Sequence, residues 1–240
     1  MQHLDVTVVS QAISWLQQQP VWLCTVLSTY GSSPRSPGAL MAATRDGRYS
    51  GSLSGGCVEE DFLRRMAAGE YQAASQVIRY GEGGMTPNVA LPCGGVLDVL
   101  IEYLPASEAS IAYLRRIAGA LEGHHALIKR LTLPNACHSL EQSHFTSATQ
   151  VERRLEQITL HIAAAPRLLI AGLSSVALYC ADFAVALGFE VLVCENRPEA
   201  LDNFAAELKP GVTLLRQFPA KFIEEGGCHA NTAVVALTHD

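Results

Sequence analysis

The sequence lacks the features that mark several large classes of protein. No lysine- or arginine-rich run occurs in the 240 residues, whose net charge is −6, and this argues against nucleic acid or an anionic membrane as a partner. No window approaches the roughly 20 consecutive apolar residues of a membrane-spanning helix. The first residues show no basic segment followed by an apolar one, as a secretory signal would. We therefore expect a cytoplasmic protein with no nucleic-acid or membrane partner.

Metal-binding patterns of cysteine and histidine are also missing. The seven cysteines are irregularly spaced, with no Cys-x-x-Cys pair and no His-Glu-x-x-His motif. An odd number of cysteines without a signal peptide predicts reduced thiols rather than a disulfide framework. A structural zinc site is therefore not expected.

What is present is an apolar chain with the periodicities of an α/β fold. At 49% hydrophobic and 17% charged residues, the chain is apolar enough to bury a core. Helical spacing occurs in residues 5–19, 57–68, 107–122, 175–187 and 219–225, and strand-like runs occur in 21–28, 39–44, 48–53, 75–80, 96–104, 126–133, 167–171, 190–194, 213–215 and 232–238. We expect a first domain over residues 1–105, a connecting helix, strand and linker over 106–165, and a second domain over 166–240. Residues 134–154 have no clean pattern and are predicted to be an irregular surface linker.

The segment Gly51-Ser-Leu-Ser-Gly-Gly-Cys57-Val-Glu-Glu60 predicts the end of a strand, a glycine turn and the start of a helix. A cysteine in the first turn of a helix lies among N–H groups without an intrahelical partner, and these favour the thiolate. The same donors, loosened by two glycines, can bind an anion. The acids that follow compete with such an anion, so a capped helix with an ordinary cysteine is the alternative interpretation.

Two further loops have unusual composition. Gly31-Ser-Ser-Pro-Arg-Ser-Pro-Gly38 is either a rigid turn between strands or an anion-binding loop in which Arg35 grips a phosphate. The long loop over residues 81–95 ends in Cys93-Gly-Gly95, directly before a predicted buried strand. Long loops inside compact domains tend to be functional. Two glycine-flanked cysteines at strand ends are hard to explain by packing alone.

Residues 21–104 resemble the N-terminal domain of the XdhC/CoxI family, accessory proteins for molybdenum hydroxylases such as xanthine dehydrogenase. The motifs that carry the resemblance are Gly-Ser-Ser-Pro-Arg (31–35), Ser-Gly-Gly-Cys-Val-Glu (54–59) and Cys-Gly-Gly (93–95). The resemblance implies a non-catalytic chaperone that binds molybdenum cofactor, holds it during sulfuration and passes it to the apo-enzyme. It also implies an N-terminal α/β domain followed by a Rossmann-like three-layer domain.

The resemblance further implies which residues contact the cofactor, as molybdopterin or its dinucleotide form. The residues that match motif positions are Arg35, Cys57, Glu59 and Cys93, and the glycines that would let the backbone approach the ligand are Gly55, Gly56, Gly94 and Gly95. Because thiolates select soft metals, Cys57 and Cys93 are the candidates to contact molybdenum or sulfur. The expected partners are a xanthine dehydrogenase-type molybdenum hydroxylase and a cysteine desulfurase.

Residues 167–195 resemble the dinucleotide-binding unit of the family's C-terminal Rossmann domain. A strand leads into Gly172, a helix follows, and Glu195 comes after the next strand, where an acid can bond a ribose hydroxyl. Ser174 replaces the second glycine of the fingerprint, the one that lets the backbone approach a pyrophosphate. An oxidoreductase that binds NAD(P) through Gly172 and Glu195 is the alternative function.

The resemblance also predicts a chain that is shorter than its relatives. Family members usually continue beyond the last strand with further strand and helix units. We therefore expect the C-terminal domain to be incomplete, with an unpaired sheet edge that a second copy in a homodimer could cover.

Overall fold

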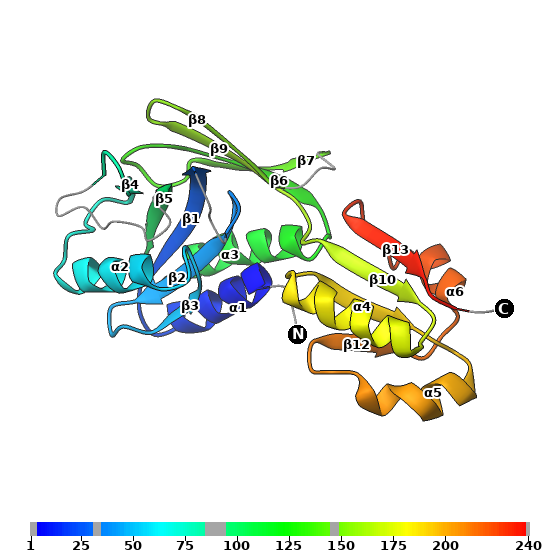
Figure 1. Ribbon diagram of the computed structural model, residues 1–240. Helices are drawn as coiled ribbons and strands as arrows, with labels where there is room; N and C mark the ends of the chain where they lie inside the picture. The colour runs from blue at the N-terminus through cyan, green and yellow to red at the C-terminus, as the bar shows by residue number, and fades with distance from the viewer. Residues whose placement is uncertain (1–3, 31–34, 85–94, 145–148, 239–240) are drawn as a thin grey trace. The chain divides into compact units, whose positions relative to one another are not determined.

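The computed structural model describes residues 4–30, 35–84, 95–144 and 149–238. The chain divides into two compact units, a larger one between Asp5 and Ala163 and a smaller one from Ala164 onward (Figure 1). Within the described residues, no helix combines the length and apolarity needed to cross a membrane.

The larger unit contains an antiparallel first sheet in the order β3-β2-β1-β5-β4. Its strands are β1 (Val21–Tyr30), β2 (Leu40–Thr44), β3 (Tyr49–Gly51), β4 (Ser75–Tyr80) and β5 (Val96–Leu104). The near-continuous apolar runs of β1 and β5 fit their central places, where both faces are covered. The predicted hairpin at Asp46-Gly47 joins β2 to β3.

One helix covers one face of the first sheet. Helix α2 (Cys57–Ala67) packs Val58, Phe62 and Met66 against β1, β2 and β5, as its apolar spacing predicts. Because α2 begins directly after the turn that follows β3, the sheet and this helix together fix the turn between them.

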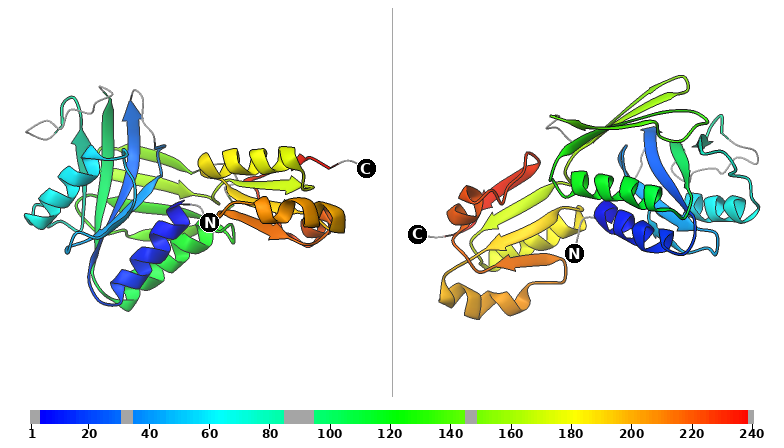
Figure 2. Two further views of the ribbon diagram at one scale, coloured as in Figure 1. Left: turned by 60° about the horizontal axis from the view of Figure 1, so that its bottom comes forward. Right: turned by 180° about the vertical axis from the view of Figure 1, so that it is seen from behind.

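The opposite face shares a core with two helices and a second antiparallel sheet. Helices α1 (Leu4–Leu16) and α3 (Glu108–Leu121) lie side by side in both views of Figure 2 and contribute to that core. The second sheet has the order β7-β6-β9-β8, with β6 (Ala126–Thr132), β7 (Ser139–Ser143), β8 (Gln150–Arg154) and β9 (Gln157–Ile162).

The prediction of an irregular linker over residues 134–154 was wrong. Strands β7 and β8 lie there, at the two edges of the second sheet. Neither strand has a fully buried residue. Because these strands are polar, they lack the alternation of apolar and polar residues by which a half-buried strand is recognised in a sequence.

The smaller unit is a parallel sheet in the order β12-β11-β10-β13. Its strands are β10 (Arg167–Ala171), β11 (Glu190–Cys194), β12 (Val212–Leu215) and β13 (Thr232–Ala236), and its helices are α4 (Ser175–Ala186), α5 (Pro198–Phe204), the short 3-10 helix η1 (Ala205–Glu207) and α6 (Pro219–Glu224). Helices α4 and α5 pack on one face of the sheet and α6 on the other. This 3-2-1-4 order is that of the first strands of doubly wound dinucleotide-binding folds.

Candidate functional site

The three motif segments of the larger unit leave the first sheet at the same end. Tyr30, the last residue of β1, pairs with Val96, the first residue of β5, and Gly51 at the end of β3 pairs with Met41 near the start of β2. Because neighbouring strands are antiparallel, the segments after β1, after β3 and before β5 all emerge on one side. Tyr30 is 79% exposed there. Residues 31–34 and 85–94, with most of two motifs, lie outside the described residues.

A turn built around the carboxylate of Glu59 joins β3 to α2. Glu59 is only 4% exposed. Its Oε1 accepts hydrogen bonds from the N–H groups of Leu53 (2.7 Å), Ser54 (3.0 Å) and Gly55 (3.1 Å) and from Ser52 Oγ (2.7 Å), and its Oε2 accepts from the N–H of Gly56 (2.9 Å) and from Ser54 Oγ (3.0 Å). The anion cradle expected in this turn is therefore filled by the chain's own carboxylate.

The charge of Glu59 is stabilised by this arrangement. Burial raises the pKa of Glu59, but hydrogen bonds from Ser52 and from the backbone N–H groups of Ser54 and Leu53 outweigh it and hold the pKa well below its usual range. Gly55 has a φ of +90°, which favours glycine, and a Cβ added at Gly55 or Gly56 would meet no atom within 4 Å. The outer surface of the turn is therefore open backbone.

Arg35, predicted to grip a phosphate, is bound to an acid of the same unit. Its Nη2 donates to Oδ1 of Asp5, in the first turn of α1, over 2.9 Å, and the same oxygen accepts the N–H of Leu40 over 3.0 Å. The two charged side chains are 22% and 11% exposed. The ion pair ties the segment after β1 to α1, and any contact between Arg35 and a cofactor stays a prediction.

Two glycines, one on each side of residues 85–94, approach each other closely. Gly81 has a φ of +91°, and a Cβ there would lie 2.2 Å from the carbonyl oxygen of Gly95. Only glycine fits this position without displacing the backbone. Gly95 is thereby fixed directly before β5, and Cys93 and Gly94, outside the described residues, immediately precede it.

Two arginines share the buried carboxylate of Asp98 near the same end of the sheet. Arg79 donates from Nε and Nη2 over 2.8 and 2.9 Å, Ser28 Oγ donates over 3.1 Å, and Arg153 Nη1 from β8 lies 3.5 Å away. The hydrogen bonds from Arg79 are the main reason that the pKa of Asp98 is lowered. Sequence reasoning missed this network, although Arg79 and Asp98 face each other on adjacent strands and form a cross-strand charge pair.

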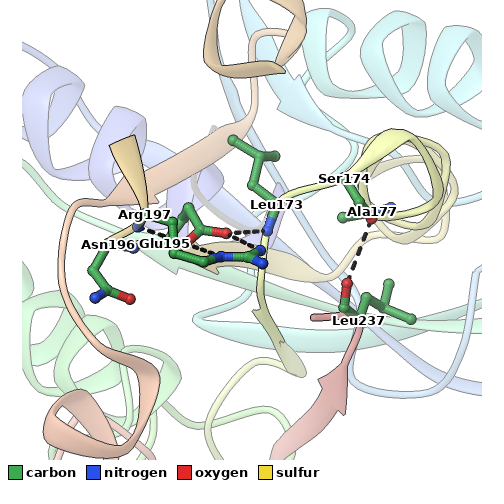
Figure 3. Close-up of polar contacts among 7 residues, drawn as sticks. All are labelled: Leu173, Ser174, Ala177, Glu195, Asn196, Arg197 and Leu237. Atoms are coloured by element: carbon green, nitrogen blue, oxygen red, sulfur yellow. Dashed lines mark hydrogen bonds and ion pairs between the residues drawn. The ribbon is translucent and has the colours of Figure 1, made fainter. Parts of the chain in front are cut away.

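Gly172, Ser174 and Glu195 all follow the carboxyl ends of strands in the smaller unit. Ser174 and Glu195 each accept hydrogen bonds from within the chain (Figure 3). Ser174 caps α4 by accepting the N–H of Ala177. Gly172 has a φ of +99°, and a Cβ there would lie 2.6 Å from the Cβ of Thr238. The segment after β13 passes so close to Gly172 that a residue with a side chain would not fit there.

Glu195, the predicted ribose ligand, is 2% exposed and accepts hydrogen bonds from the chain itself. Its donors are the N–H groups of Leu173 (2.8 Å), Asn196 (2.9 Å) and Arg197 (2.8 Å) and the Arg197 guanidinium through Nε (3.0 Å) and Nη2 (2.8 Å). Burial raises the pKa of Glu195, but these bonds from Arg197 and Leu173 outweigh it and lower the pKa to about 2. A ribose hydroxyl would have to displace at least one of these donors.

Candidate metal ligands remain those predicted from sequence. Within the described side chains, no three His, Cys, Asp or Glu residues gather as a metal site. The side chains of Cys57 and Cys93 are not among those described, so their contact with molybdenum or sulfur stays a prediction. Cys24 is fully buried in β1, where burial is the main reason that the pKa of its thiol is raised, as expected of a packing residue.

Comparison with known proteins confirms the family resemblance. Residues 14–81 match the model of the XdhC and CoxI family. The molybdenum cofactor insertion chaperone PaoD of Escherichia coli (strain K12) is 36% identical over 99 residues, which cover 40% of this chain and 30% of PaoD. The match thus spans less than a third of the length of that relative.

Two further relatives extend over most of the chain. A probable xanthine dehydrogenase subunit of Bacillus subtilis (strain 168) is 25% identical over 245 residues, which cover 92% of this chain and 73% of that protein. A crystal structure described as a xanthine dehydrogenase from Bacillus halodurans matches with a TM-score of 0.68 and 21% identity, covering 100% of this chain and 75% of the other. This last likeness supports the α/β fold.

Proposed function

We propose, on the premise that residues 14–81 carry the signature of the XdhC and CoxI family, that this protein is a molybdenum cofactor chaperone. It holds the cofactor during sulfuration and inserts it into a xanthine dehydrogenase-type molybdoenzyme. The observation that carries the proposal is that the strand ends leading into all three family motifs lie at one end of the first sheet. This arrangement supports one shared site for segments that are far apart in the chain.

The chemistry of the residues at this end suits such a ligand. Cys57 and Cys93 supply sulfur, which soft metals select. Gly55 and Gly56 offer open backbone, and the exposed ring of Tyr30 offers an apolar face for a planar pterin. The bound cofactor would supply the molybdenum chemistry, and the chain would bind, orient and shield it.

The proposed partners follow from the same role. A chaperone that delivers cofactor must form a transient complex with its client, here a xanthine dehydrogenase-type molybdenum hydroxylase. Sulfuration requires a sulfur donor, for which a cysteine desulfurase in the cytoplasm is proposed. The outer strands of the parallel sheet, β12 and β13, are the proposed contact of a homodimer.

The second candidate function is NAD(P) binding by the smaller unit. Its strand order supports this interpretation, whereas the internal engagement of Ser174 and Glu195 opposes it. Both tryptophans, Trp15 and Trp22, lie in the larger unit, so the fluorescence of NADH itself is the signal to follow. A saturable change on titration would favour this function.

The chaperone proposal is tested by purifying the protein from cells that make the cofactor. The expected result is that pterin and molybdenum remain bound through purification, and that the loaded protein activates a cofactor-free xanthine dehydrogenase-type enzyme. Protein that carries neither pterin nor molybdenum, and that activates nothing, would contradict the proposal.

A further inference from the structure

The carboxylate of Glu59 is surrounded by hydrogen-bond donors of its own turn. Six donors reach its two oxygens within 3.1 Å, four of them consecutive backbone N–H groups from Leu53 to Gly56. A carboxylate has about four lone-pair positions, so the carboxylate of Glu59 is saturated. Its neighbour Glu60, on the same helix turn, is exposed.

This geometry differs from that of a ligand-binding acid. A residue that binds a cofactor must present at least one oxygen outward, whereas Glu59 is 4% exposed and directs both oxygens into the turn. Gly56 is the N-cap of α2 and has no side chain that could cap the helix. Of the two hydrogen bonds of a capping box, this turn can therefore form only the one from the Gly56 N–H to Glu59, at the third helical position.

We propose that Glu59 is a positioning residue for Cys57 rather than a cofactor ligand. By binding the N–H groups of residues 53–56, it fixes the backbone from which Cys57 starts α2. It also occupies the place that an external anion would take, so the phosphate of the cofactor binds elsewhere. The inference rests on the proposed function only in giving Cys57 a role with the cofactor.

The physical advantage is that the turn is ordered before a ligand arrives. A glycine-rich turn has high conformational freedom when it is not held. Ordering it during binding would subtract from affinity, whereas an internal carboxylate orders it in the free protein. The residue that follows the turn is then presented with a fixed backbone.

The test measures the alkylation rate of Cys57 in cofactor-free protein, with each cysteine followed separately by peptide mass spectrometry. Glu59→Ala should change the rate at Cys57 at least about fivefold, because the turn that sets the position of its backbone is no longer held. Glu60→Ala, which removes the neighbouring exposed acid, should leave the rate within twofold. The rate at Cys137, far along the chain, is the internal reference and should not change in either variant.

Chemical rescue separates positioning from general loss of structure. Millimolar to molar acetate can enter the vacated place in Glu59→Ala and should return the rate at Cys57 toward that of the wild type, with no effect on Glu60→Ala. An unchanged rate at Cys57 in Glu59→Ala would overturn the inference. So would a rise at all cysteines alike that acetate fails to reverse.

Because the measurement uses cofactor-free protein, its outcome is independent of the chaperone proposal. A wild-type protein that binds no pterin would contradict the proposed function but not the positioning role of Glu59. An unaltered Cys57 in Glu59→Ala would end the positioning role and leave the chaperone proposal standing.

Discussion

The N–H of Leu173, in the glycine turn after β10, donates a 2.8 Å hydrogen bond to Oε2 of Glu195 at the end of β11 (Figure 3). In the dinucleotide-binding unit, these two positions serve the pyrophosphate and the ribose of one ligand. Here they are bound to each other, and Arg197 completes the partners of the acid. The acid at the position that contacts a ribose in such units is thus bound by donors of its own chain.

The first prediction concerns the pH dependence of this bond. The pKa of Glu195 falls from an ordinary 4.5 when unfolded to about 2 in the folded protein. Its charge therefore stabilises the fold above about pH 4.5, and this contribution is lost as the pH falls toward 2. Glu195→Gln should cost about 2 kcal/mol at pH 7 and progressively less below pH 4.5.

Urea unfolding of the wild type and Glu195→Gln at pH 7, 4 and 3 measures this difference. Glu207→Gln, at an exposed acid of the same unit, is the control and should match the wild type throughout. A difference between the wild type and Glu195→Gln that stays constant from pH 7 to pH 3 would show that the charge of Glu195 is not the stabilising feature.

The second prediction concerns the two arginines on Asp98. Asp98→Ala should cost about 2 kcal/mol, because it removes the buried carboxylate that accepts two hydrogen bonds from Arg79 and one from Ser28. Arg153→Ala should cost under about 1 kcal/mol, because Arg153 lies 3.5 Å away and its side chain is 38% exposed. Arg154→Ala, the exposed neighbour on β8, is the matched control for Arg153. Denaturant unfolding checks all three, and equal costs for Asp98→Ala and Arg153→Ala would contradict the geometry.

The third prediction concerns a buried ion pair beneath the first sheet. Lys129 on β6 is 1% exposed and bonds Glu102 on β5, which also accepts the hydroxyl of Tyr113 over 2.9 Å. Lys129→Met alone should cost about 3 kcal/mol, because it leaves a buried carboxylate without its cation. Adding Glu102→Gln should restore about half of that loss, since the neutral amide still accepts the tyrosine hydroxyl. A double variant less stable than Lys129→Met would refute this interpretation.

The close approach at Gly81 provides the fourth prediction. Gly81→Ala should destabilise the protein by about 2 kcal/mol or more, because its Cβ would lie 2.2 Å from the oxygen of Gly95 at a φ of +91°. Gly83→Ala, at a φ of +72° with no atom within 4 Å of the added carbon, should cost only about 1 kcal/mol. Denaturant unfolding compares them. Cofactor retention should fall only in Gly81→Ala, since that change displaces the segment carrying Cys93.

Strong apolar patterns were enough to predict most of the fold. The continuous run of β1 and the helical spacing of Val58, Phe62 and Met66 predicted the first sheet and α2 correctly. Strands β7 and β8 were not predicted, because their residues are polar and their stability comes from pairing with β6 and β9. Tertiary pairing of this kind has no local signal.

The candidate site was predictable only in its residue types. The family resemblance predicts Cys57, Glu59 and Arg35 as site residues, and their roles with a cofactor stay predictions. It does not predict that Glu59 and Arg35 make hydrogen bonds within their own chain. Glu59 turns inward because the backbone N–H groups of its turn point at its carboxylate, and the sequence alone does not give that backbone conformation. Whether Arg35 is free for a phosphate depends on Asp5, an acid 30 residues earlier in sequence that only the fold brings near.

The proposed function requires that molybdenum cofactor bind at the end of the first sheet where Tyr30, Gly51 and Val96 lie. The most direct measurement is pterin bound per chain in wild type, Cys57→Ser, Cys93→Ser and Cys137→Ser, all purified from cells that make the cofactor. Cys137 lies in the same unit, outside the three motifs. We expect the wild type and Cys137→Ser to retain equal pterin, and Cys57→Ser and Cys93→Ser to lose most of it. Equal retention by all four proteins would contradict it.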